Sequence, residues 1–358
     1  MQYSIMFFSA DTCGGNPYRL LADVCRFADA HGFTAVWTPE RHFHDFGGAY
    51  ANPAVTSAAI AMITERVQIR AGSLISPLHD EVRLAEEWAM VDNLSSGRVG
   101  ISFGSGWNIN DFVFFPERYE RRHAVMYQQI ETVQALWRGE PVIRRNSVGK
   151  DVEITLRPRP QSATLPLWIT SSGNVDTFRS AGRIGANLLT HFITQDLPTL
   201  QQKIAEYRDA RRQAGFDPAT GCVTVMLHTY LGNDLEEVKQ TVRPYFIRYL
   251  RSAVSLEQLA SGGGGSISGG YRIDPEDISP DLLSELLDIA FERYFEKASL
   301  MGTVRGCQEF ITKLGAIGVD EIACLIDFGP APEQVIRSLR HVAGLVQPAE
   351  TRAMAGVA

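Results

Sequence analysis

The stretches Val67-Gln-Ile-Arg-Ala-Gly-Ser-Leu-Ile75, Glu81-Val-Arg-Leu-Ala-Glu-Glu-Trp-Ala-Met-Val-Asp-Asn-Leu94 and Arg98-Val-Gly-Ile-Ser-Phe-Gly-Ser105 follow one another closely in the chain. The first and third are apolar with little polar alternation, which is typical of strands buried on both faces. The second carries apolar residues at helical spacing. Together they predict a β–α–β unit, in which two parallel strands are joined by a right-handed helical crossover.

The same alternation continues along nearly the whole chain. Further strands are predicted at Tyr3–Ser9, Thr34–Glu40, Leu167–Ser172, Ala186–Ile193, Val223–Leu231 and Glu321–Phe328. Further helices are predicted at Tyr18–His31, Tyr119–Trp137, Leu197–Ala214 and Glu236–Leu250. Eight such strands predict a (β/α)₈ TIM barrel with loop insertions, forming a single domain over residues 1–346 with a C-terminal tail at 347–358. The alternative is an open doubly wound sheet, against which no Gly-x-Gly-x-x-Gly turn follows the first strand.

Three connections are longer than a barrel requires, namely Arg41–Asn52, Gly139–Pro166 and Ser255–Pro280. The last contains Ser261-Gly-Gly-Gly-Gly-Ser266, a composition without a fixed shape, so residues 255–280 are predicted to be a flexible insert at the barrel rim. A lid and an insert without function are both open interpretations. Pro330 is expected to open the closing helix.

Composition limits the class of protein. The chain has 358 residues, of which 45% are hydrophobic, and a net charge of −7, which argues against a nucleic-acid partner. Its five cysteines lack any C-x-x-C spacing, which is typical of reduced thiols in a cytoplasmic protein. No apolar run approaches the roughly 18 residues that a membrane span needs, and residues 1–10 lack the features of a signal peptide. A cytoplasmic protein without a membrane partner is expected.

Polar residues follow several predicted strands, where a barrel builds its site. The second strand ends in Trp37-Thr-Pro-Glu-Arg-His-Phe-His44, whose charged side chains are costly to bury unless they pair or bind a ligand. The fifth ends in Trp168-Ile-Thr-Ser-Ser-Gly-Asn174 and opens a helix near Val175. Hydroxyls and free N–H groups at a helix start make an anion site, although a simple helix cap would look the same.

Several segments together resemble the bacterial luciferase-like flavin monooxygenases, and within them the luciferase-like proteins of polyketide and nonribosomal peptide biosynthesis. These segments are Glu40-Arg-His-Phe-His-Asp-Phe-Gly-Gly48, Tyr50-Ala-Asn-Pro53, Arg70-Ala-Gly-Ser73, Ala85-Glu-Glu-Trp-Ala-Met-Val-Asp-Asn-Leu-Ser-Ser-Gly-Arg98, Phe103-Gly-Ser-Gly-Trp-Asn-Ile-Asn-Asp-Phe112, Leu136-Trp-Arg-Gly-Glu140, Leu188-Leu-Thr-His191 and Met226-Leu-His-Thr-Tyr230. Each is modest alone, but their order and spacing are specific, and the resemblance runs from about residue 1 to 346.

The resemblance implies an FMN-dependent monooxygenase of the two-component type. Reduced FMN from a separate flavin reductase would react with O₂ to give a C4a-(hydro)peroxide, which the protein shields and directs. The implied substrate is a polyketide or peptide intermediate, either a small molecule or an acyl group on a carrier protein. Baeyer–Villiger insertion and hydroxylation both remain open, and a homodimer is expected. A basic patch formed by Arg118, Arg121 and Arg122 is a candidate docking surface for a carrier protein.

The same resemblance assigns cofactor-binding positions. Glu40 matches an acidic residue beside the flavin ring, and Gly72–Ser73 matches a non-proline cis peptide beneath it. Residues lining the flavin edge correspond to Trp107 and Asn108. The segment that holds the FMN phosphate corresponds to Ser171, Ser172, Gly173 and Thr177.

Two positions depart from luciferase. Arg41 stands where luciferase has a histidine, with His42 next, and Ser105 stands where luciferase has an arginine that meets the phosphate. Another cation must then face the phosphate, and the candidates are Arg41, Arg179 and Arg183. FAD remains an alternative cofactor.

Catalytic roles fall to the residues after the second strand. His42 is expected to handle protons, Arg41 to stabilise an anion, and His44 to assist. His191 and His228, at the ends of strands six and seven, are candidates for the substrate side. Each histidine could equally be a satisfied structural residue.

Three other functions remain open. One is an F420-dependent hydride-transfer oxidoreductase on the same barrel, and another is a flavin-binding protein without turnover. The third is a metal-dependent hydrolase, suggested by the spacing His42-Phe-His44 with His191 and Asp327, although no metal site is expected.

Overall fold

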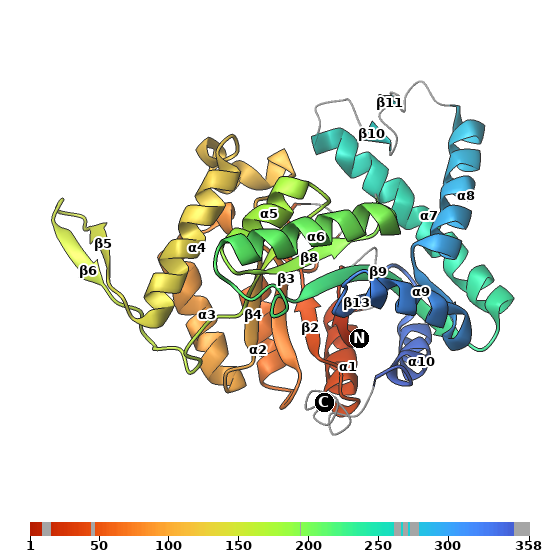
Figure 1. Ribbon diagram of the computed structural model, residues 1–358, viewed down its shortest axis with the longest axis horizontal. Coiled ribbons are helices and arrows are strands. Elements are labelled where there is room, and N and C mark those ends of the chain that lie inside the picture. The colour runs from red at the N-terminus through yellow and green to blue at the C-terminus, as the bar shows by residue number, and fades with distance from the viewer. Residues whose placement is uncertain are drawn as a thin grey trace.

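The computed structural model describes residues 1–8, 16–43, 47–193, 195–260, 266–267, 271–272 and 279–346. For residues 253–260, 266–267, 271–272 and 280 it describes the backbone only. Outside the described residues lie His44, the tail 347–358 and part of the segment 255–280. The rest of that segment, apart from Ser279, is described by its backbone alone. Strands and helices alternate along the chain, with the helices arranged around the strands (Figure 1).

Eight parallel strands form a closed barrel, as the sequence predicts. They are β1 (Gln2–Met6), β2 (Ala35–Thr38), β3 (Gln68–Ile75), β4 (Val99–Gly104), β7 (Leu167–Ser171), β8 (Asn187–His191), β9 (Val223–Gly232) and β13 (Glu321–Leu325). Successive strands pair in chain order, and β13 pairs with β1, which closes the ring. The TIM-barrel prediction is confirmed, and the open doubly wound sheet is excluded by this closure.

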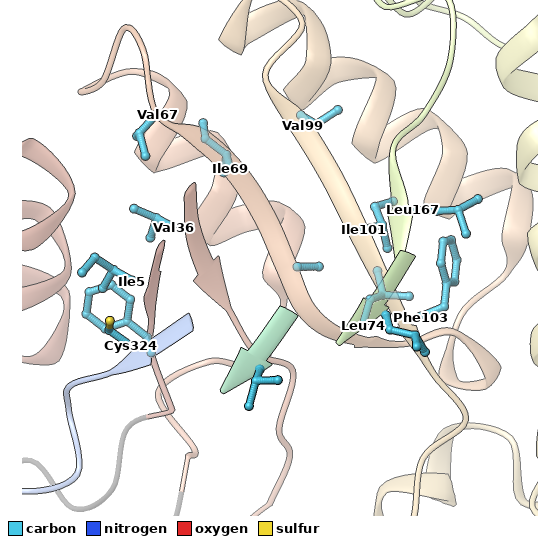
Figure 2. Close-up of a cluster of buried hydrophobic side chains, with 14 of the residues drawn as sticks. Ile5, Val36, Val67, Ile69, Leu74, Val99, Ile101, Phe103, Leu167 and Cys324 are labelled. Carbon is cyan, nitrogen blue, oxygen red and sulfur yellow. The ribbon is translucent and has the colours of Figure 1, made fainter. Parts of the chain in front are cut away.

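The strands form because nearly every residue in them can be buried. Ile5, Val36, Ile69, Ile101 and Cys324 lie on five neighbouring strands and belong to one hydrophobic cluster between the barrel and its helices (Figure 2). Each of these five side chains has 0% exposure, so the barrel wall is packed on its outer face as well as inside. This is why the strands show apolar runs instead of alternation.

The N-terminal end of the barrel is filled by an ion pair. Arg70 Nη1 donates to both carboxylate oxygens of Glu321, at 3.0 and 2.9 Å, and both residues are buried. The guanidinium of Arg70 lies over the rings of Trp37 and Trp168, 4.7 and 4.3 Å from their centroids. Ser4 Oγ donates to Glu321 Oε1 at 2.6 Å. The filled end leaves the opposite, C-terminal end of the strands to carry a site.

The helices around the barrel begin at polar caps. They are α1 (Pro17–Ala30), α2 (Pro53–Ala61), α3 (Glu81–Ser95), α4 (Arg122–Arg138), α5 (Val175–Arg183), α6 (Leu197–Gln213), α7 (Leu235–Ala260), α8 (Pro280–Lys297), α9 (Val304–Ala316) and α10 (Pro332–Ala343). Asn16, Asn52 and Asp80 each accept a backbone N–H in the first turn of α1, α2 and α3. Every predicted helix is present, with shifted ends.

Three predicted boundaries are wrong. The fourth helix begins at Arg122 instead of Tyr119, because a 3₁₀ turn at Pro116–Arg118 precedes it. The closing helix begins at Pro332 instead of Pro330, because the chain first turns at Gly329, where φ is +129°. The segment expected to be an insert from residue 255 continues α7 up to Ala260.

The long connection at 139–166 contains structure that the sequence did not reveal. Strands β5 (Val142–Arg145) and β6 (Asp151–Ile154) form an antiparallel hairpin that projects away from the barrel beyond α4 (Figure 1). A further strand, β12 (Leu300–Thr303), extends the end of β9, pairing Leu300 with Thr229. Within the described residues, no helix has both the length and the apolar character required to cross a bilayer.

Candidate active site

Glu40 lies just beyond β2 and joins three segments at the barrel mouth. Its Oε1 lies 3.1 Å from His42 Nε2 and 2.7 Å from His79 Nε2, and its Oε2 accepts the Ile75 N–H at 2.6 Å. Its own N–H donates to the carbonyl of Ser73 at 3.0 Å. The residue is 4% exposed. A carboxylate with this many donors is fixed in place and satisfied despite its burial.

These contacts keep Glu40 ionised. Burial by itself would raise the pKa of Glu40, but hydrogen bonds from His42, His79 and the Ile75 N–H outweigh it and leave the pKa below its usual value. Burial would lower the pKa of His79, but its hydrogen bond and charge interaction with Glu40 raise it. The pair therefore favours a carboxylate beside a readily protonated imidazole.

His42 and Arg41 lie at the rim of the same opening. The His42 ring contacts Phe114 edge-on, with centroids 5.1 Å apart. The Arg41 guanidinium lies 4.0 Å from the centroid of Phe8 and 5.9 Å from that of Trp107. Burial lowers the pKa of Arg41 to about 10, while Tyr249 and Asp111 oppose this shift, so the side chain is cationic at neutral pH. The predicted pair thus places a cation and an imidazole side by side.

The ends of β3, β4 and β7 present small residues and hydroxyls. The Gly72–Ser73 peptide bond is cis, as the resemblance implied. A Cβ on Gly72 would lie 2.8 Å from Trp37 Cε3, so glycine is required there. Ser73 Oγ and Ser102 Oγ lie 2.5 and 2.6 Å from Thr170 Oγ1, which links the three strands through their hydroxyls.

The loop after β4 positions Trp107 and Asn108, with Ser105 at its start. Trp107 is 44% exposed and flanks Arg41, whereas Asn108 is buried and donates from Nδ2 to Asp111 Oδ1 at 2.8 Å. Burial raises the pKa of Asp111 to about 6, against the opposing effect of nearby His42 and Arg41. The amide of Asn108 is therefore engaged within its own loop, and Asp111 adds a second carboxyl group to the rim.

The segment after β7 turns sharply into α5. The N–H of Gly173 donates to Ser171 Oγ at 3.2 Å, and Asn174 Oδ1 caps the helix by accepting the Asp176 N–H at 2.8 Å. Thr177 lies in the first turn, and its N–H donates to the carbonyl of Asn174 at 3.1 Å. Ser171, Ser172, Gly173 and Thr177 are thus brought together at the N-terminus of one helix, as predicted.

Lys203 of α6 also reaches this turn. Its Nζ donates to Gln195 Oε1 at 3.0 Å, and Gln195 Nε2 in turn donates to Thr190 Oγ1 at 3.2 Å and to the carbonyl of His191 at 2.5 Å. A Cβ built on Gly173 would lie 3.1 Å from Lys203 Nζ. Lys203 is not recognisable as a site residue from the sequence, because nothing in the α6 pattern distinguishes it from a solvated surface residue.

The arginines suggested for the same role are placed differently. Arg179 pairs with Asp176 at 2.9 Å and with Glu206 at 3.1 Å. Arg183 is the last residue of α5, at the opposite end from Asn174, and Arg41 lies at the rim formed by β2 and β4. None of the three therefore lies at the turn between β7 and α5.

His191 ends β8, and His228 lies within the adjacent strand β9. His228 is fully buried, its Nδ1 lies 2.9 Å from Tyr294 Oη, and its ring is met edge-on by Phe246, Tyr249 and Phe328 at centroid distances of 4.9, 4.4 and 5.5 Å. Burial lowers the pKa of His228 to about 3 and that of His191 to about 4, so both are neutral at pH 7. Among the described residues, His228 Nε2 and His191 Nδ1 are buried without a hydrogen-bond partner.

The predicted residues thus fall into two groups at one barrel mouth. We call Glu40, Arg41, His42, Trp107 and Asn108 the rim cluster, to which the structure adds His79 and Asp111. The turn cluster comprises Ser171, Ser172, Gly173 and Thr177, to which it adds Gln195 and Lys203. Asp111 lies within the quoted motif at 103–112 but had no assigned role, and His79 lies four residues beyond the end of β3. In the part of the chain that the structure describes, no three His, Cys, Asp or Glu side chains are grouped to hold a metal ion.

Comparison with known proteins places this barrel in a family. The family model for luciferase-like monooxygenases matches residues 1–320. The oxygenase component of the flavin-dependent trigonelline monooxygenase of Acinetobacter baylyi is 24% identical, over 93% of this chain and 89% of that protein. The FMNH₂-dependent dimethylsulfone monooxygenase of Pseudomonas putida is also 24% identical, over 94% and 90%.

Solved structures share the fold. The monooxygenase RslO1 of Streptomyces bottropensis superposes with a TM-score of 0.79 at 23% identity, covering 96% of this chain and 98% of that one. The oxygenating constituent of the Pseudomonas putida 3,6-diketocamphane monooxygenase, in complex with FMN, gives 0.70 at 17% identity, covering 97% and 100%. An F420-dependent secondary alcohol dehydrogenase gives 0.69 at 17%, covering 97% and 99%. With the family model matching most of its length, the chain belongs to the luciferase-like monooxygenase family.

Proposed function

We propose that this chain is the oxygenase component of a two-component monooxygenase that takes reduced FMN from a separate reductase and uses O₂. The observation that carries the proposal is the joint presence of the rim and turn clusters at one barrel mouth. The rim cluster offers an ionised carboxylate, an imidazole and a cation, and the turn cluster offers hydroxyls and N–H groups at a helix start. Curated relatives that act with flavin support the same cofactor class.

The residues at the mouth fit FMN in chemical type. Gly72 has no room for a side chain because Trp37 and Met6 pack against it, and the flat ring system would rest beside the cis peptide bond that follows Gly72. The positive end of α5 favours a phosphate beside Ser171, Ser172 and Gly173. Trp107, Asn108 and Glu40 would border the ring, with Ser73 and Ser105 on neighbouring strand ends. FAD is an alternative cofactor, because the exposed side of the mouth at Trp107 would accept a group larger than FMN.

Bound reduced FMN would supply the electrons that activate O₂. The chain contributes charge and proton control around it. Because ionised Glu40 can only accept hydrogen bonds, it fixes the proton of neutral His42 on Nε2 and leaves Nδ1 as the atom that can accept a proton. Arg41 would stabilise negative charge that develops on oxygen. His44, outside the described residues, remains a predicted assistant.

The substrate is proposed to be a polyketide or peptide intermediate, free or carried as an acyl group on a carrier protein. His191 and His228 are neutral, and His228 lies among aromatic rings, which suits an uncharged, partly apolar group. Of the three arginines proposed to dock a carrier protein, two donate hydrogen bonds within the chain. Arg118 donates to the carbonyls of Pro77 and His79, and Arg122 to those of Gly106 and Tyr119, which leaves Arg121 the most available of the three. Insertion beside a carbonyl and hydroxylation are both compatible with these groups.

The test is a flavin titration followed by rapid mixing with O₂. The purified chain is titrated with oxidised and with reduced FMN, and the reduced complex is then mixed with O₂ in a stopped-flow spectrometer. We expect tight binding of reduced FMN and a transient flavin spectrum that precedes oxidised FMN. The matched control is Ile143→Ala on the projecting hairpin, which should not alter either result. Failure to bind FMN or FAD in either redox state would overturn the proposal.

An F420-dependent hydride transfer is the second candidate. Solved structures of this fold include an F420-dependent alcohol dehydrogenase and an F420-dependent tetrahydromethanopterin reductase, the latter with a TM-score of 0.73. Titration with F420 under the same conditions separates the two candidates. Binding of F420 without binding of FMN would favour hydride transfer.

A further inference from the structure

We propose that Lys203 is the cation that binds the terminal phosphate of FMN and makes the turn cluster selective for a phosphomonoester. The inference rests on the proposed function, since it presumes a flavin at this barrel mouth. Lys203 lies on α6 and would supply the positive charge that is missing just after β4, where the chain has Ser105.

Lys203 places its charge beside the positive end of a helix. The Lys203 ammonium lies against Gly173, where a Cβ would be only 3.1 Å away, and Gly173 immediately precedes the N-cap of α5. The N-terminus of a helix carries positive potential, so a second positive charge beside it is unfavourable without an anion. Within the described ranges, no carboxylate lies within 4.0 Å of Lys203 Nζ, and its hydrogen-bond partner Gln195 is neutral. The positive potential of the α5 N-terminus and the charge of Lys203 therefore meet at the turn between β7 and α5.

The Lys203 ammonium is held in place by a chain of hydrogen bonds. Gln195 is anchored by Thr190 Oγ1 and by the carbonyl of His191, and it accepts from Lys203. The next residue, Asp196, caps α6 through the Thr199 N–H at 2.9 Å and acts on Lys203 only at longer range. His191, beside this chain of contacts, has a buried Nδ1 with no partner among the described residues. A prearranged cation next to an unsatisfied polar atom points to a polar ligand.

The other cations suggested for the phosphate are already paired or lie too far from the turn. Arg179 already neutralises Asp176 and Glu206, and Arg183 lies at the other end of α5. For the nine residues of α5 the helix is roughly 13 Å long, too far for Arg183 to share a phosphate with Gly173. Among the basic residues that the structure describes, Lys203 is the one that lies at the turn between β7 and α5.

The charge of the ligand gives the selectivity. A terminal phosphate carries about −1.5 to −2 charges at pH 7, because its second pKa is about 6. The bridging diphosphate of FAD and the phosphodiester of F420 carry one charge per phosphate, and each phosphate presents fewer free oxygens. An ammonium together with a helix N-terminus should therefore favour FMN over riboflavin strongly and over FAD moderately.

The experiment compares three flavins that share the ring system and the ribityl chain and differ in the group at the end of that chain. Dissociation constants of FMN, riboflavin and FAD, each in the oxidised and the reduced state, are measured by fluorescence quenching and calorimetry for the wild type, Lys203→Gln, Lys203→Arg and the control Arg179→Gln. We expect Lys203→Gln to weaken FMN about tenfold to a hundredfold, as for loss of a charged hydrogen bond, and to leave riboflavin unchanged. Lys203→Arg should restore much of the FMN affinity, and Arg179→Gln should change neither. Added salt should weaken FMN binding more in the wild type than in Lys203→Gln.

Each other outcome counts against the inference in a distinct way. Equal weakening of FMN and riboflavin by Lys203→Gln would assign Lys203 a structural role, and circular dichroism with thermal melting checks this directly. Unchanged FMN affinity in that variant would refute the phosphate contact while leaving the flavin proposal intact. If the wild type binds none of the three flavins, the proposed function itself fails, and the inference fails with it.

Discussion

At the scale of single residues, the rim cluster depends on Glu40. Its two oxygens receive hydrogen bonds from His42, His79 and the backbone of Ile75, which come from three different segments. A buried carboxylate without such partners would be protonated or would destabilise the fold. The contacts instead lower the pKa of Glu40 and raise that of His79, so each group stabilises the charged form of the other.

These shifts predict how His79 affects stability with pH. A raised pKa of His79 in the folded state means that the protonated imidazole adds stability below its ordinary pKa of about 6.5, and this is lost as the pH rises through the folded value. The unfolding free energy of the wild type should therefore exceed that of His79→Gln by about 1 kcal/mol more at pH 6 than at pH 9. Urea denaturation at each pH measures the difference.

The pH range is chosen because of Glu40. Its lowered pKa adds stability above about pH 4.3 that is lost only as the pH falls through the folded value, so Glu40 stays ionised throughout pH 6–9. His341→Gln, on the outer helix α10, serves as the control and should show no such trend. A constant gap between wild type and His79→Gln across the range would contradict the assigned charge interaction.

At the scale of elements, close packing of α5 on α6 sets the position of the turn cluster. Gly182 in α5 faces α6 so closely that a Cβ would lie 2.5 Å from the Tyr207 carbonyl oxygen and 2.9 Å from the Ala210 Cβ. Because Lys203 lies on α6 and Gly173 just before α5, any separation of these helices would also separate the ammonium from the turn.

Gly182→Ala should therefore destabilise the protein by about 1–3 kcal/mol, as expected for overpacking. It should also weaken FMN binding while leaving the far-ultraviolet circular dichroism unchanged. Gly315→Ala is the matched control, since its Cβ would meet only Met1 Cε at 3.6 Å in an exposed part of α9. That change should be neutral or stabilising, by up to about 1 kcal/mol. Equal unfolding free energies for the two variants would contradict the packing argument.

At the scale of the whole molecule, Arg70 and Glu321 join distant parts of the chain inside the barrel. They lie 251 residues apart in sequence, on β3 and β13, and are 3% and 0% exposed. Removing one partner leaves the other as an unpaired buried charge, which lowers the free energy of unfolding by about 3–5 kcal/mol. Replacing both by apolar residues avoids that penalty.

Arg70→Met and Glu321→Leu should each destabilise the barrel severely, and the double variant should lose clearly less than the sum of the two. Denaturant unfolding of the three variants completes a double-mutant cycle. Additive losses would show that the two side chains do not depend on each other. An Arg179→Gln variant, which removes only the exposed ion pairs with Asp176 and Glu206, should lose at most about 1 kcal/mol.

The expected homodimer is a prediction at the same scale. Val55 and Met62 on and after α2, and Met90 and Leu94 on α3, are apolar yet 66, 69, 54 and 45% exposed. Apolar residues gathered on neighbouring helices often mark an interface. Light scattering should give twice 39.6 kDa for the wild type, and Met90→Glu should shift the protein to monomer while Ile143→Glu does not. A monomeric wild type would contradict the prediction.

The sequence by itself determined the barrel. Its eight strands are buried on both faces, so residues such as Val36 and Ile101 had to be apolar regardless of position, and the pattern is readable without the structure. The resemblance located the Gly72–Ser73 cis peptide and the turn at Ser171–Gly173 because these depend on short local motifs. The hairpin β5–β6 and the start of α10 were not readable, since short exposed strands and turns have weak local signals.

Only the tertiary structure decided which charges meet at the barrel mouth. Lys203 looks like any exposed helical lysine until α6 packs against α5 and brings its ammonium to Gly173, thirty residues earlier. Likewise the pKa of His79 is raised by Glu40 from another strand end, and the pKa of Asp111 is raised by its burial in the folded chain. Burial is encoded residue by residue in polarity, but electrostatic pairing depends on distances between remote segments, and folding alone sets those distances.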